Sequence, residues 1–211
     1  MEIVKDSTTS TILPVRKTIR YLMWKRYLHL WDQYVSNRHK LNKSIDPWCQ
    51  YIINQCYGDV GVYNSGGLFF TDFIKNLTVI EHFRCPINIK GMNYIEDDIN
   101  FNYNFDCLIM INPESIKYQH NLSDFLAHPG VSRAGFKPNI LNWVKPGGKI
   151  FLSFTDWYIY YDRLRFSHSN MIDQQLDNLA KIGLTCIYKN VGKLNDAPIV
   201  GNIKLILQMN R

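Results

Sequence analysis

Apolar residues recur along the chain with two different spacings, which mark short strands and short helices. The run Phe105–Ile111 is apolar almost throughout, as is typical of a strand buried on both faces of a parallel sheet. Further runs predict strands at residues 59–64, 77–80, 87–92, 149–154, 184–191 and 200–209. Apolar positions at helical spacing predict helices at residues 47–57, 68–75, 136–144 and 171–182.

The alternation of these strands and helices predicts parallel βαβ units in a doubly wound, Rossmann-like α/β sheet. We expect the last two strands to form an antiparallel pair. In such sheets, ligands bind beyond the carboxyl ends of the strands. Binding and catalytic residues are therefore expected in the loops after the first, second and fourth strands.

The N-terminal segment carries aromatic residues at helical spacing. They are three or four residues apart: Tyr21, Trp24, Tyr27, Trp31 and Tyr34. Pro14 suits a helix start, and Asp46-Pro47 marks the next boundary. We expect a helix over residues 14–41, within a helical extension at 1–47 that precedes an α/β domain at 48–211. Three roles are open for this aromatic face. It packs on the α/β domain as part of the core, it stacks on the bases of a nucleic acid, or it contacts a helix of a partner protein.

The excess positive charge lies in the same N-terminal segment. Residues 1–43 hold nine basic and three acidic residues, the rest of the chain holds 15 of each, and the net charge is +6. The positive charge predicts that the helix at 14–43 binds nucleic acid or an acidic partner. The alternative is that the charged side chains form a solvated helix face. The chain has no run of 18 apolar residues, so we expect no membrane-spanning helix.

Length and cysteine usage narrow the class of protein. The 211 residues fit one domain, and 46% hydrophobic residues exclude bulk disorder. Five scattered cysteines without a CxxC pair favour a reducing cytoplasm over a disulfide framework. We predict no metal site, because the histidines lack ligand spacing. Frequent Asn and Ile beside few Ala indicate an AT-rich gene, as in a virus, an intracellular bacterium or a streamlined marine bacterium. For a viral protein, the cytoplasm would be that of the host. The oligomeric state is left open.

The order of motifs resembles that of the class I S-adenosylmethionine-dependent methyltransferases. A strand, a glycine loop, a helix and a strand ending in an acid come first, and FDCLIMINP and LNWVKPGGKIFL follow. The resemblance covers residues 48–211. It implies seven strands with the last one reversed, and S-adenosylmethionine as the cofactor.

The first loop of that family usually reads acidic-x-Gly-x-Gly. Here the corresponding residues are Asn64, Ser65, Gly66, Gly67 and Leu68. Gly66 matches, whereas Asn64 replaces the acid and Leu68 the second glycine. Because glycine lets the backbone approach a ligand closely, Leu68 would crowd the methionine pocket unless Gly67 shifts the turn. The alternative is a plain strand-to-helix turn.

The resemblance assigns three further residues to the cofactor. Glu81 ends the second predicted strand, where an acid of the family accepts hydrogen bonds from the ribose hydroxyls. Asn93 follows the third predicted strand, where the family often has an Asp on the adenine amino group, and Tyr94 would flank the ring. The alternatives are a solvated Glu81 and ordinary loop residues.

Residues after the fourth predicted strand are the catalytic candidates. Amino-methylating members carry Asn/Asp-Pro-Pro-aromatic there, and this chain has Asn112, Pro113, Glu114 and Ser115. Glu114 would act as a base or orient an amine, or is an exposed loop acid. The aromatic loop at 155–166 forms the acceptor site or a hydrophobic lid.

The resemblance thus implies in-line methyl transfer to an acceptor, with nucleic acid as one candidate. The departures at Asn64 and Leu68 favour an alternative, a protein that keeps the fold as a binding or structural module without activity. A third alternative is another reaction on the cofactor in the same crevice.

Overall fold

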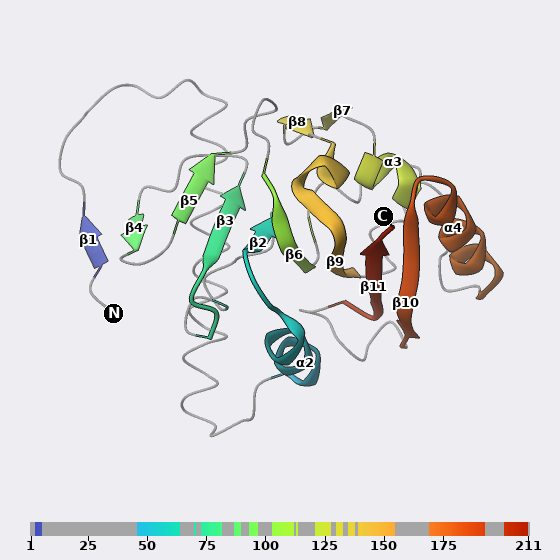
Figure 1. Ribbon diagram of the computed structural model, residues 1–211, viewed down its shortest axis with the longest axis horizontal. Helices are drawn as coiled ribbons and strands as arrows, with labels where there is room; N and C mark the ends of the chain where they lie inside the picture. The colour runs from blue at the N-terminus through green and yellow to red at the C-terminus, as the bar shows by residue number, and fades with distance from the viewer. Residues whose placement is uncertain are drawn as a thin grey trace.

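The computed structural model is built around one seven-stranded sheet with the strand order β10-β11-β9-β6-β2-β3-β5 (Figure 1). The structure describes residues 3–5, 46–63, 70, 73–81, 87–89, 93–96, 103–111, 113, 121–127, 130–132, 135–137, 139–154, 169–192 and 201–210. The strands of the sheet are β2 (Val60–Tyr63), β3 (Leu77–Glu81), β5 (Asn93–Glu96), β6 (Phe105–Ile111), β9 (Val144–Phe154), β10 (Leu184–Val191) and β11 (Ile203–Met209).

One strand of this sheet runs against the others. β5, β3, β2, β6 and β9 pair in parallel, whereas β11 is antiparallel to both β9 and β10. The predicted α/β sheet with an antiparallel closing pair is confirmed. The predicted run at 105–111 is also confirmed, because β6 is a central strand with buried residues pointing to both faces.

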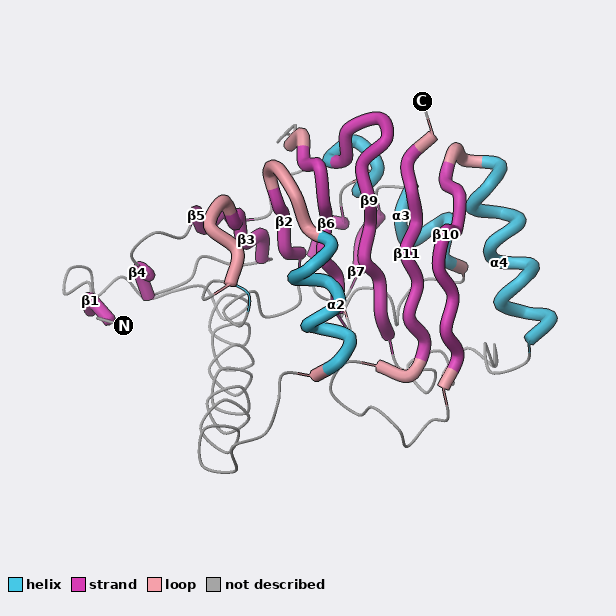
Figure 2. The backbone as a smooth tube through the Cα atoms, turned by 60° about the horizontal axis from the view of Figure 1, so that its bottom comes forward, coloured by secondary structure: helices cyan, strands magenta, loops and turns pink. Residues whose placement is uncertain are grey.

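Helices cover both faces of the sheet (Figure 2). On one face, Trp48 and Ile52 of α2 (Pro47–Gln55) pack on side chains of β2, β6 and β9. On the other face, α3 (Leu122–Ala127) and α4 (Ser169–Lys181) pack with Leu108 and Leu152 in the second core cluster. The result is a three-layer α/β arrangement.

Local sequence signals explain the bounds of the two longest helices among the described residues, α2 and α4. Pro47 opens α2, and the Asp46 carboxylate accepts hydrogen bonds from the backbone N–H groups of Trp48 (2.8 Å) and Cys49 (3.3 Å). α4 is followed by Gly183 with φ +86°, a conformation in which glycine is favoured. The helices predicted at 47–57 and 171–182 are therefore confirmed to within a few residues.

The strand predicted at 87–92 is present only over residues 87–89, and its predicted place as the third strand of the main sheet is wrong. The third parallel strand is β5, and β4 (Ile87–Ile89) instead pairs with β1 (Ile3–Lys5) in a separate two-stranded sheet. Because β5 is an edge strand with one pairing neighbour, its sequence NYIE lacks the continuous apolar run that marks central strands.

The predicted helix at 136–144 is also wrong. β8 (Gly135–Lys137) pairs with β7 (Gly130–Ser132), and only the 3-10 helix η3 (Ile140–Trp143) follows before β9. Pro138 disfavours helical backbone at the preceding Lys137, which explains the interruption. The Asn139 side chain then begins η3 by accepting the N–H of Leu141 at 3.1 Å.

Of the helix predicted at 68–75, the structure describes only Phe70 and residues 73–75, which form a turn. The N–H of Ile74 donates to the carbonyl of Phe70 at 2.9 Å, and Lys75 is no longer helical. The predicted helix at 14–41 and the loop at 155–166 lie outside the described residues. None of the helices in the described ranges combines the length and hydrophobicity needed to cross a bilayer.

Candidate functional site

The carboxyl ends of β2, β3 and β5 lie at one edge of the sheet (Figure 1). Tyr63, the last residue of β2, is paired with Ile80, and Glu81 extends β3 by one residue beyond that level. Glu81 is paired in turn with Glu96, the last residue of β5. Two acidic residues therefore end neighbouring parallel strands at the same level.

Glu81 takes the position that the sequence predicts for it, at the carboxyl end of the second parallel strand. A carboxylate has only acceptor sites, so at this edge it suits a ligand that presents hydroxyl donors. Glu96 is the acidic residue that the sequence analysis missed. Its signal in the sequence is the acidic run Glu96-Asp97-Asp98, which begins at the last residue of β5.

Asn93 and Tyr94 are not at this edge. They begin β5 rather than following the third strand, and they are paired with Thr78 and Val79. The prediction that Asn93 follows the third strand is therefore wrong, because that strand begins six residues later than the 87–92 run placed it. The end of β5 is at Glu96 instead.

The remaining predicted site residues are only partly described. Pro113 is buried two residues beyond the end of β6. Asn112 and Glu114 on either side of it lie outside the described residues, and so do the first-loop residues Asn64, Ser65, Gly66 and Gly67. The structure brings together the strand ends from which both loops start.

The end of β2 is held by an aromatic cluster. The ring of Trp143 in η3 packs edge-on against Tyr63, with centroids 5.2 Å apart and planes at 79°. Trp143 also packs edge-on against Tyr103 at 5.1 Å. Trp143 of the LNWVKPGG motif thus packs against the last residue of the strand from which the predicted cofactor loop begins.

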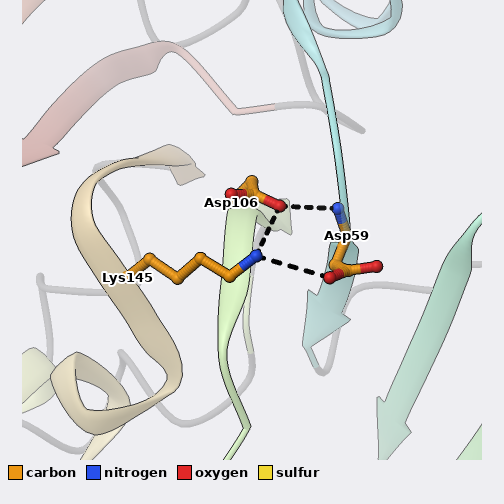
Figure 3. Close-up of polar contacts among 3 residues, drawn as sticks. All are labelled: Asp59, Asp106 and Lys145. Atoms are coloured by element: carbon orange, nitrogen blue, oxygen red, sulfur yellow. Dashed lines mark hydrogen bonds and ion pairs between the residues drawn. The ribbon is translucent and has the colours of Figure 1, made fainter.

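A charged cluster of Asp59, Asp106 and Lys145 lies at the amino ends of β2, β6 and β9. Figure 3 shows its side chains and their contacts. The Lys145 ammonium is 2.8 Å from Asp106 Oδ2 and 3.4 Å from Asp59 Oδ2. The backbone N–H of Asp59 also donates to Asp106 Oδ2, at 2.8 Å. These contacts tie together the amino ends of β2, β6 and β9.

The charged groups of this cluster are paired with one another. The hydrogen bond from Lys145 holds the pKa of Asp106 below its usual value, and the N–H of Asp59 adds to the effect. The same contact with Asp106 raises the pKa of Lys145. Because ligands bind beyond the opposite ends of such strands, the cluster stabilises the fold rather than forming a ligand site. Within the described ranges, no group of three His, Cys, Asp or Glu side chains could hold a metal ion.

No protein family model and no curated protein matches this sequence. Solved structures do resemble it. An S-adenosylmethionine-dependent methyltransferase from Clostridium acetobutylicum aligns with a TM-score of 0.51 and 12% identity, over 90% of this chain and 100% of the other. A methyltransferase from Pyrococcus furiosus aligns with a TM-score of 0.50 and 12% identity, over 89% and 98% of the two chains.

A third structure, the glycopeptide N-methyltransferase MtfA complexed with sinefungin, aligns with a TM-score of 0.50 and 10% identity. The alignment covers 78% of this chain and 92% of MtfA. At such low identity, these likenesses show the arrangement of the sheet and helices alone.

Proposed function

Because the chain has the fold of the class I S-adenosylmethionine-dependent methyltransferases, we propose that it binds S-adenosylmethionine and transfers the methyl group to an acceptor. The observation that carries the proposal is Glu81 at the carboxyl end of β3, one residue beyond the level at which β2 ends. The predicted cofactor loop, Asn64 to Gly67, starts from that end of β2.

The residues at this edge fit the cofactor chemically. S-adenosylmethionine carries a ribose with two adjacent hydroxyl donors, and its sulfonium supplies an activated methyl group. Glu81 accepts hydrogen bonds from the ribose hydroxyls. Glu96, paired with Glu81 on the neighbouring strand, adds a second carboxylate that favours a ligand with a positive charge.

The acceptor side of the site is built by the residues after β6. Asn112 accepts a hydrogen bond from the acceptor group, Pro113 fixes the loop, and Glu114 orients that group or takes its proton. Since methyl transfer needs the donor and the acceptor held in line, positioning is the main task of these residues. Pro113 is buried, which suits a fixed loop.

Calorimetry of the full chain with S-adenosylmethionine and S-adenosylhomocysteine tests the cofactor site. We expect micromolar binding and a loss of about 10- to 100-fold in Glu81→Gln, because a hydrogen bond to a charged group contributes roughly 1.5–3 kcal/mol. Asn93→Ala is the matched control, since Asn93 lies at the other end of β5, and it should bind as the wild type does. No binding at millimolar ligand would overturn the proposal and leave a binding or structural module.

The acceptor proposal concerns the basic segment at 14–43, which we assign to a nucleic acid. Neutralising Arg16 and Lys17 to Gln should weaken binding to single-stranded RNA and reduce the salt dependence of the affinity. The matched control is Lys75→Gln with Lys181→Gln, which removes two exposed lysines of the α/β domain. An unchanged salt dependence in the first variant would show that the segment does not bind the phosphates.

A further inference from the structure

Three aromatic rings meet between α2 and β10, and we call them the aromatic triangle. Trp48 and Tyr51 come from α2, and Tyr188 comes from β10. The ring centroids of Trp48 and Tyr51 are 5.8 Å apart, and those of Tyr188 are 5.7 Å from Trp48 and 5.8 Å from Tyr51. The planes of each pair lie within 25° of each other. Since the three separations are nearly equal, the rings form a triangle rather than one stacked column.

The three rings differ in how far they reach the solvent. Trp48 is 4% exposed, whereas Tyr51 is 39% exposed and Tyr188 is half-buried. The buried Trp48 ring therefore supports the other two from the core side. A tyrosine ring that is already held by its neighbours loses little conformational freedom when a flat ligand stacks on it.

An unpaired positive charge lies on the same face of the sheet. Lys204 of β11 is paired with Asn190 of β10, and the Asn190 side-chain amide donates to the Tyr188 hydroxyl at 3.5 Å. Paired side chains of neighbouring strands lie on one face, so Lys204 lies on the face of Tyr188. Within the described residues, no carboxylate pairs with the partly exposed Lys204. α2 has no charged side chain, and the Asp46 carboxylate before it accepts two backbone N–H groups.

The row of the sheet that contains Lys204 leads to the end of β6. On its other side Lys204 is paired with Ser153 of β9, and Ser153 is paired with Ile111, the last residue of β6. The acceptor candidates at 112–114 follow that strand directly. The positive charge therefore lies level with the strand end at which the acceptor side of the proposed site begins.

The basic segment at 14–43 is joined to this surface by a short stretch of chain. Only residues 44–46 separate Lys43 from Pro47, the first residue of α2. Four steps of extended chain span at most about 14 Å. Tyr51 follows one turn into α2, so a nucleic acid bound by the basic segment has Tyr51 within reach of its next nucleotides.

We propose that the aromatic triangle and Lys204 bind a single-stranded nucleic acid, with a base stacked on Tyr51 and a phosphate beside Lys204. This inference rests on the proposed function, because it concerns the acceptor that we assign to the segment at 14–43. Aromatic rings stack on the open face of any unpaired base, and a lysine neutralises a backbone phosphate. The surface therefore selects a single strand over a duplex without selecting a sequence.

Fluorescence anisotropy of the full chain with a short labelled oligouridine, at several KCl concentrations, tests the proposal. We expect Tyr51→Ala to weaken binding by about 5- to 100-fold with an unchanged salt dependence, because the lost interaction is stacking. Tyr51→Leu keeps an apolar side chain in the triangle and should show the same loss, whereas Tyr51→Phe should bind as the wild type does. Lys204→Gln should instead reduce the slope of log affinity against log salt by about 0.7.

Two control variants lie away from this surface. Tyr57→Ala removes a tyrosine that is 48% exposed just beyond the other end of α2, and Lys181→Gln removes an exposed lysine of α4. Both should bind the oligouridine as the wild type does, and thermal unfolding shows that each variant is folded. An unchanged affinity in Tyr51→Ala and Tyr51→Leu, or an equal loss in Tyr57→Ala, would overturn the proposal.

The outcomes also separate this inference from the proposed function. If neutralising Arg16 and Lys17 weakens RNA binding and the Tyr51 variants do not, the triangle alone is excluded. If the wild type binds S-adenosylmethionine but no RNA, this inference and the nucleic-acid acceptor both fail, and the cofactor site stands. A Tyr51-dependent dimer in sedimentation velocity, without RNA binding, would assign the surface to a second copy of the chain and overturn the proposal.

Discussion

Trp143 packs edge-on against Tyr63, with 5.2 Å between the ring centroids and both side chains buried. The contact joins the segment before β9 to the last residue of β2. It links the LNWVKPGG motif, which carries the family resemblance most specifically, to the strand end where the predicted cofactor loop starts. Leu141, Trp143 and Val144 of this motif are buried, so the motif forms part of the core.

We expect Trp143→Ala to lower the free energy of unfolding by about 3–5 kcal/mol, because removing a buried aromatic side chain leaves a cavity. Urea unfolding followed by circular dichroism measures the change. Phe73→Ala is the control, since Phe73 is 44% exposed and should cost less than about 1 kcal/mol. Equal losses in the two variants would contradict the anchoring role of Trp143.

Gly58 is required by both its backbone and its neighbour. It has φ +63°, and a Cβ there would contact Asp106 Oδ2 and lie 2.6 Å from Asp106 Cγ. Gly183 has φ +86°, but a Cβ there would meet nothing within 4 Å. Gly183→Ala should therefore cost only the backbone term of about 1–2 kcal/mol, and Gly58→Ala should cost roughly 1 kcal/mol more. A smaller loss in Gly58→Ala would show that Asp106 moves aside freely.

The ion pair between Asp106 and Lys145 makes stability depend on pH. Because the pKa of Asp106 is lowered in the folded protein, its contribution is present above the unfolded pKa of about 3.9 and is lost as the pH falls through the folded value. The stability difference between the wild type and Asp106→Asn should therefore shrink below about pH 4.

Lys145 sets the alkaline limit of the pH range in which this ion pair contributes to stability. Its pKa is raised, so its contribution is present below about pH 10.4 and is lost as the pH rises through the folded value. Urea unfolding of the wild type, Asp106→Asn, Lys145→Met and the double variant across this range measures both limits. A coupling between the two residues that stays constant from pH 3 to pH 11 would contradict the assignment.

The sequence predicts correctly those helices and strands whose burial follows one regular pattern along their whole length. β6 is buried on both faces and α4 has one apolar face, so their patterns are unambiguous. β5 is different, because an edge strand needs no continuous apolar run. The neighbouring 87–92 run is more apolar, so the pattern favours a strand there instead.

The residues of the candidate site also differ in how far the sequence predicts their positions. Glu81 could be predicted because it ends a clear apolar strand, whereas the predicted position of Asn93 depended on a wrong strand boundary. The contact between Lys145 and Asp106 spans 39 residues, and the hydrogen bond between Asp59 and Asp106 spans 47. Neither has a local signal, so only the register of parallel strands reveals them.

Ser153 and Asn202 are the two buried polar residues among those described, and they differ in how they are satisfied. The Asn202 side-chain amide donates to the carbonyl of Gly192 at 3.1 Å. The Ser153 hydroxyl is buried near the end of β9 and has no hydrogen-bond partner among the residues that the structure describes. A buried hydroxyl without a partner costs free energy, so Ser153→Ala should leave stability unchanged or raise it by about 1 kcal/mol.

Asn202→Ala should lower stability by roughly 1–3 kcal/mol, because it leaves the Gly192 carbonyl without its side-chain donor. Thermal and urea unfolding of both variants measure these changes in stability. A clear loss of stability in Ser153→Ala would show that this hydroxyl is hydrogen-bonded in the folded protein.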